Sequence, residues 1–204
     1  MKTVVIEKTY YTIDELKEVN IKGYNTAHED FIYMNQDCYH WEYEAIESIE
    51  KFLDLFNCTL DEFRYGGTPY DTFSFTCKGI WTYDEEENDI LVSDLEEIKG
   101  ENIKTYIDEM SFTHKDNIKR IINNYNEWLL TGYHLDEVLL KPLYDFLNNE
   151  QYKEYSLYDI LYECLSDALE CINEDYEYQL SEESFKEYCY SNNLLFDIDG
   201  NPEE

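Results

Sequence analysis

The chain has 204 residues and carries 47 acidic against 15 basic side chains, a formal net charge of −32. Its hydrophobic content of 43% and aromatic content of 17% are those of a folded protein rather than an acidic disordered tail. So large an excess of negative charge argues against unaided binding to nucleic acid or to an anionic membrane, because both are polyanions, and it favours a basic protein partner.

The sequence shows no targeting or membrane-spanning segment. The opening residues, MKTVVIEKTYYT, contain a short apolar run that soon meets charge. No apolar stretch approaches the roughly 20 residues that a helix needs to cross a bilayer. We therefore expect a cytoplasmic protein without a membrane partner, whose cysteines are reduced thiols. These cysteines are Cys38, Cys58, Cys77, Cys164, Cys171 and Cys189.

Two capping signals and one apolar stripe predict the first helices. Thr12 and Glu15 have the spacing of a capping box and predict a helix that runs to about Val19. Thr26 and Glu29 repeat that spacing and predict a second helix start. The next helix is indicated by an apolar stripe at helical spacing, formed by Trp41, Ala45, Ile46, Ile49, Phe52, Leu53 and Phe56.

Residues 59–83 change character towards aromatic residues and threonine. A Gly-Gly-Thr-Pro turn that begins at Gly66 separates two short extended runs, and this pattern predicts an antiparallel hairpin. The acidic run that follows, DEEEND at 84–89, is expected to be a loop between this small sheet and a helical second half.

The second half reads as helical. Pro142 should start or bend a helix, and the long helical region from Ser156 onward should break near Leu180, where Ser181 can cap a last helix. The predicted fold class is α+β, mostly helical, with a small antiparallel β-hairpin or sheet in the first half and a helical second half. We expect an N-terminal α+β part at 1–83 and an acidic loop with a helical part at 84–204, packed as one continuous domain.

One set of residues has the chemistry of a structural zinc site. Cys38 and His40 are two residues apart and can both reach one ion, while Cys58 and Cys77 bracket the hairpin and could supply two more ligands. The alternative is that these cysteines pack as small hydrophobic residues. The chain has no Cys-x-x-Cys pair, so no cofactor is firmly implied.

The sequence does not indicate an enzyme. It contains no nucleophile elbow, no phosphate loop and no dinucleotide fingerprint. Glu163, Asp167, Glu170 and Glu174 share one face of a predicted helix, where carboxylates could hold Mg²⁺ for a nuclease reaction. A solvated acidic face is the simpler interpretation.

Two acidic segments are candidates for binding a partner, because each has aromatic residues that could act as desolvated anchors. The first comprises Trp81, Tyr83, Asp84, Glu85, Glu86, Glu87 and Asp89. The second comprises Glu174, Asp175 and Glu177, close to Tyr176 and Tyr178.

Four stretches give the chain a resemblance to a known family. They are YTIDELKE at 11–18, WEYEAIESIEKF at 41–52, LTGYHLDEVLLKPLYDFL at 130–147 and EDYEYQLSEESFKEY at 174–188. Together they resemble small acidic proteins from phages and prophages of Gram-positive bacteria, some of which are labelled as antitoxins.

The resemblance and the charge together imply an inhibitor in an infected or lysogenic bacterial host. Some acidic phage proteins of this kind are anti-CRISPR proteins, and the implied partner is the type II-A RNA-guided nuclease, whose loading with nucleic acid would be blocked. The alternatives are an antitoxin-like protein that neutralises a basic toxin, and a metal-dependent nuclease.

Overall fold

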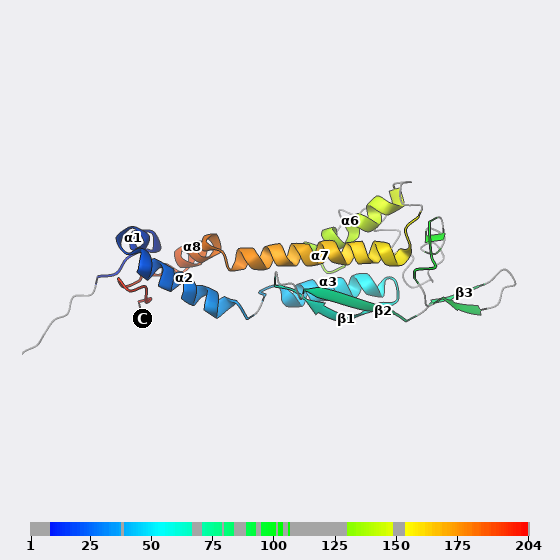
Figure 1. The fold of residues 1–204 in the computed structure, drawn as a ribbon, viewed down its shortest axis with the longest axis horizontal. Coiled ribbons are helices and arrows are strands. Elements are labelled where there is room, and N and C mark those ends of the chain that lie inside the picture. Colours follow the sequence, from blue (N-terminus) through cyan, green and yellow to red (C-terminus); the bar gives the residue numbers. More distant parts are fainter. Residues whose placement is uncertain are drawn as a thin grey trace, which may run out of the picture. The chain divides into compact units, whose positions relative to one another are not determined.

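A computed structural model describes residues 9–37, 39–66, 71–78, 80–83, 89–92, 95–100, 102–103, 106, 130–148 and 154–203 (Figure 1). The helices are α1 (Ile13–Val19), α2 (Ile21–Asn35), α3 (Glu42–Asp54), α6 (Leu135–Asn148), α7 (Leu157–Gln179) and α8 (Glu182–Ser191). The strands are β1 (Cys58–Arg64), β2 (Thr72–Cys77), β3 (Ile80–Tyr83) and β4 (Asp89–Val92), in two antiparallel pairs. The predicted α+β class, with a hairpin in the first half before a helical second half, is confirmed.

The chain groups by contact into two units. The first unit comprises residues 1–40 and 175–204, and the second comprises residues 41–174. One boundary lies before Trp41 and the other lies within α7, after Glu174. The division expected from the sequence, at 83/84 within one continuous domain, stays a prediction.

The start of the first unit confirms one predicted cap and corrects the other. Thr12 caps α1: its hydroxyl accepts from the N–H of Glu15, whose carboxylate accepts from the N–H of Thr12. The helix start predicted at Thr26 is wrong, because α2 begins at Ile21 with Asn20 as its N-cap. Asn20 is itself a strong capping residue. Thr26 lies inside the helix and satisfies its hydroxyl by donating to the carbonyl of Lys22, 3.1 Å away.

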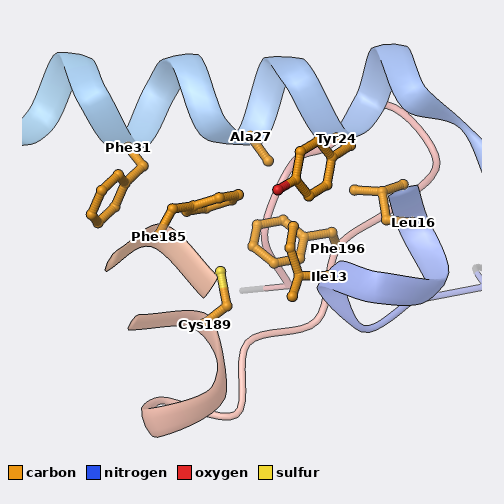
Figure 2. Close-up of a cluster of buried hydrophobic side chains, with 8 residues drawn as sticks. All are labelled: Ile13, Leu16, Tyr24, Ala27, Phe31, Phe185, Cys189 and Phe196. Atoms are coloured by element: carbon orange, nitrogen blue, oxygen red, sulfur yellow. The ribbon is translucent and has the colours of Figure 1, made fainter. Parts of the chain in front are cut away.

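The core of the first unit joins its two ends (Figure 2). Phe185 of α8 lies 5.9 Å from Tyr24 and 5.3 Å from Phe31, measured between ring centroids, and both partners are on α2. Phe196 is buried with them, and its backbone pairs with that of Tyr11 through two hydrogen bonds of 2.8 and 2.9 Å. The full cluster is Ile13, Leu16, Tyr24, Ala27, Phe31, Phe185, Cys189 and Phe196.

Two glycines allow the C-terminal turn to lie directly on α2. A Cβ atom on Gly23 would be 2.3 Å from the carbonyl oxygen of Ile198. A Cβ atom on Gly200, whose φ is +94°, would be 2.1 Å from the carbonyl oxygen of Gly23. The Asn20 side chain adds a hydrogen bond of 2.7 Å to the carbonyl of Ile198. Within this turn, the carboxylate of Asp197 accepts from the N–H of Asn201 at 2.9 Å.

The β1–β2 hairpin packs on α7 in the second unit. Its register runs from Cys58 opposite Cys77 to Arg64 opposite Thr72. Phe73 lies 4.9 Å from Tyr162, and Phe75 lies 5.3 Å from Tyr158, between ring centroids. Aromatic residues on one face of the hairpin therefore meet the aromatic face of α7.

The predicted apolar stripe of α3 is largely buried: Ala45, Ile49, Phe52 and Leu53 of the helix, and Phe56 just beyond it. Ile46 is half-buried, and Trp41 occupies the N-cap position and is 53% exposed.

A buried carboxylate organises the turn before α6. The carboxylate of Asp136, which is fully buried, accepts from the N–H groups of Thr131 and Gly132 at 2.9 and 2.8 Å. The hydroxyl of Thr131 also lies 2.7 Å from that of Ser48, which is buried on α3. The helix begins at Leu135, so Pro142 lies inside it and does not start it.

The close contact between Gly23 and the carbonyl of Ile198 predicts that an alanine at position 23 destabilises the protein, although the position is helical. We expect Gly23→Ala to lower the free energy of unfolding by about 1–3 kcal/mol, the usual cost of overpacking, although alanine favours helix by about 1 kcal/mol. Urea unfolding followed by circular dichroism measures this.

Gly132→Ala is the contrasting control, because Gly132 has a positive φ of +88°, unlike the helical Gly23, and has no neighbour within 4 Å of an added Cβ. It should cost about 1 kcal/mol, from backbone strain alone. A Gly23→Ala protein at least as stable as the parent would contradict the close contact.

Candidate functional site

The second predicted acidic segment lies near the end of α7. Glu174 and Glu177 are exposed, as a binding surface requires. Asp175 is half-buried, and its carboxylate accepts a hydrogen bond of 2.9 Å from the hydroxyl of Tyr39. Asp175 therefore already has an internal partner, which leaves Glu174 and Glu177 as the more available carboxylates.

The end of α7 is anchored by further hydrogen bonds within the first unit. Gln179 is buried; its amide accepts from the N–H of His40 at 2.9 Å and donates to the carbonyl of Asn35 at 3.0 Å. The hydroxyl of Tyr176 donates to the carbonyl of Gln36 at 2.5 Å. These contacts fix the direction in which the exposed carboxylates of this turn project.

The tyrosines of the second segment differ in their exposure. Tyr176 is half-buried, whereas Tyr178 is exposed and its hydroxyl donates to Glu187 at 3.0 Å. That hydrogen bond to a carboxylate is the main reason why the pKa of Tyr178 is raised. Of the two, Tyr178 is the better candidate for contact with a partner.

Exposed apolar residues on α2 were missed by the sequence analysis. Tyr33 is 73% exposed and Met34 is 67% exposed, and both follow the exposed acids Glu29 and Asp30. The phase of the helix indicates only the first of these: once Ala27 and Phe31 face the core, Tyr33 falls on the opposite side. Met34 lies seven residues after Ala27 and shares its side, but it is exposed because it is next to the last residue of α2.

The first predicted acidic segment is described only in part. Trp81 and Tyr83 lie in β3 and Asp89 lies in β4, with Tyr83 opposite Asp89 in the register. Asp84, Glu85, Glu86 and Glu87 lie outside the described residues. The expected loop ends earlier than predicted, because Asp89 and the three residues after it form a strand that pairs with β3.

The predicted zinc ligands are only partly described. Cys38 lies outside the described residues, and His40 is in the first unit. Cys58 and Cys77 face each other in the second unit and are not joined by a disulfide. The structure thus brings two of the four residues together, and the four-ligand site stays a prediction.

A second thiol and imidazole meet in the second unit. The Sγ atom of Cys171 lies 3.8 Å from Nε2 of His134. Sequence reasoning missed this pair because the two residues are 37 positions apart.

The carboxylates considered for Mg²⁺, on α7, are exposed: Glu163, Asp167, Glu170 and Glu174. Partial burial, followed by the nearby charge of Glu170, raises the pKa of Asp167. Their exposure fits the interpretation as a solvated acidic face.

An ion-pair group connects α1 with the first turn of α8. Lys17 Nζ lies 2.5 Å from Oε1 of Glu182, and Lys186 Nζ lies 3.6 Å from both that atom and Oδ1 of Asp14. The Tyr190 hydroxyl also donates to Asp14. Lys17, with a smaller effect of Tyr24, lowers the pKa of Glu182 from 4.5 to about 2.

The depressed pKa predicts how Glu182 contributes to stability. Its stabilising effect should be complete above pH 4.5 and be lost as the pH falls towards 2. We expect Glu182→Gln to be less stable than the parent at neutral pH, with the difference shrinking over that interval. Urea unfolding across a pH series measures it.

Glu183→Gln, in the same turn, is the matched control because it removes the same charge without breaking the contact with Lys17. A Glu182→Gln curve that stays parallel to that of the parent down to pH 2 would show that the ion pair does not stabilise the fold.

Comparison of the chain with protein-family models, with curated proteins and with solved structures found no match. Among the described helices, none has the length and apolar character needed to cross a membrane.

Proposed function

We propose that the chain is an acidic inhibitor that binds a basic, nucleic-acid-binding surface of a host protein. The observation that carries this proposal is the excess of 47 acidic over 15 basic residues, far beyond what solubility requires of a chain this size. Such an excess costs stability through self-repulsion, so its retention favours a use for the charge.

The placement of the lysines supports the proposal. In the described part of the first unit, the only lysines are Lys17, Lys22 and Lys186. Lys17 and Lys186 pair with acids of the same unit. The positive charges of Lys17 and Lys186 are thus paired within the unit, while the carboxylate of Glu177 in the same unit is exposed. A surface of this kind attracts lysine and arginine residues of another protein.

Electrostatic attraction would raise the association rate of the complex. Aromatic residues buried in the interface would supply most of its affinity. Carboxylates that approach a groove lined with lysine and arginine speed the encounter and occupy the places of phosphates. Charge alone gives little lasting affinity in water, whereas desolvated tyrosines act as hot spots in interfaces. The exposed Tyr178 and Tyr33 are candidates for this second role.

The partner that we propose is the type II-A RNA-guided nuclease, and the inhibited step is its loading with nucleic acid. Such nucleases hold the guide–target heteroduplex in a positively charged channel and recognise it through its backbone. An acidic protein in that channel would compete directly with the guide or the target strand. The inhibitor would then be an anti-CRISPR protein, as the sequence resemblance implies.

Three double variants, each removing two charges, locate the binding face. They are Glu86→Gln with Glu87→Gln, Glu174→Gln with Glu177→Gln, and Glu163→Gln with Glu170→Gln. We expect one of the first two to weaken binding to the guide-free nuclease about tenfold, equivalent to about 1.4 kcal/mol, because its carboxylates meet the basic surface. Surface plasmon resonance measures the affinities.

The third pair is the control, since Glu163 and Glu170 are exposed on the same helix as Glu174 but lie outside both candidate segments. It should change the affinity less than twofold. Equal losses for all three variants would mean that only total charge matters and that neither segment is the interface.

A further inference from the structure

Cys58 and Cys77 occupy a special position in the β1–β2 ladder. Cys58 is the first residue of β1 and lies opposite Cys77, the last residue of β2. Just outside this pair, the N–H of Lys78 donates to the carbonyl of Asn57 at 3.0 Å. Residues 57 and 78 thus form a hydrogen-bonded pair, and the alternation of an antiparallel ladder makes Cys58 and Cys77 a non-hydrogen-bonded pair.

This position brings the two thiols within reach of a covalent bond. Opposite residues of a non-hydrogen-bonded pair have Cα atoms about 4.5 Å apart, with both side chains on the same face. Disulfides are found at Cα separations of about 4.4–6.8 Å. No rearrangement of the hairpin is needed to join the two sulfur atoms.

The two thiols differ in their surroundings. Cys58 is 3% exposed, and its thiol donates to the carbonyl of Phe56 at 3.4 Å. Burial, followed by the neighbouring Cys77, raises the pKa of the Cys58 thiol above its usual range. Cys77 is half-buried and is therefore the thiol that a dissolved reagent reaches first.

We propose that Cys58 and Cys77 form a dithiol site that reacts with low-molecular-weight disulfides and closes into an intrachain disulfide. In the first step the thiolate of Cys77 attacks one sulfur of the reagent, whose S–S bond breaks and releases one thiol. In the second step Cys58, having lost its proton to solvent, attacks Sγ of Cys77 and releases the second thiol. The protein loses two electrons and two protons, and the reagent disulfide gains them.

The cross-link would change the base of the hairpin. It would close the loop that contains the turn between β1 and β2 and would restrict the unfolded chain. Cys77 is also followed closely by β3, which begins at Ile80. Oxidation would therefore restrict the motion of Cys77, the residue from which the chain leads into β3. This inference does not depend on the proposed function.

The test uses the full chain, freed of metal with a chelator and incubated with mixtures of oxidised and reduced glutathione. After alkylation of the remaining thiols, peptide mapping by mass spectrometry should show a disulfide between Cys58 and Cys77 and no lasting glutathione adduct. The oxidised protein should melt about 5 °C or more above the reduced protein.

Two variants separate this pair from the other cysteines. Cys58→Ser should retain glutathione on Cys77, because the second thiol is missing. Cys171→Ser removes another half-buried thiol and should leave the Cys58–Cys77 disulfide unchanged. A wild-type chain that keeps glutathione on Cys77, stays reduced throughout, or joins either cysteine to a different one would overturn the proposal.

Discussion

The contact between Gly23 and Gly200 is the constraint on which the first unit depends. Neither residue has a side chain, so the C-terminal turn lies directly against the backbone of α2. This close approach places Phe196, four residues before Gly200, in the core and allows its backbone to pair with Tyr11. Segments from opposite ends of the chain thus share one hydrophobic cluster.

The same arrangement explains how a chain with a charge of −32 can fold. The apolar residues of α1, α2 and α8 face one another, and most of the acids point to solvent, where repulsion is screened. Lys17 and Lys186 lie where acids from two helices come together. Cations used in this way stabilise the fold and leave the outer surface negative, which connects the folding of the chain to its proposed function.

Local signals in the sequence predicted a large part of the fold. The caps at Thr12 and Ser181, the α3 stripe and the hairpin each depend on residues close together in the chain, and the structure confirms them. The error at Thr26 has the same local origin, because Asn20 offered a competing cap that was overlooked. The N-cap of a helix can be predicted from the sequence when only one capping residue lies near the start of the helix.

The features that matter most for the site are long-range. Nothing near Gly23 in the sequence indicates that its partner is Gly200, and nothing near Cys58 shows that Cys77 faces it until the register is known. Asp175 looked like a surface charge, but a hydrogen bond from Tyr39, 136 residues away, gives it a structural role. Such pairings are properties of the folded chain, so composition and periodicity could only suggest candidates.

The most direct test of the proposed function is the affinity of the chain for the guide-free nuclease as the salt concentration rises, with guide RNA as a competitor. Binding through paired charges should weaken steeply with salt, and guide RNA should displace the protein because both occupy the same basic channel. An affinity that does not change with salt, or a complex that binds guide RNA and this protein together without loss, would contradict the account.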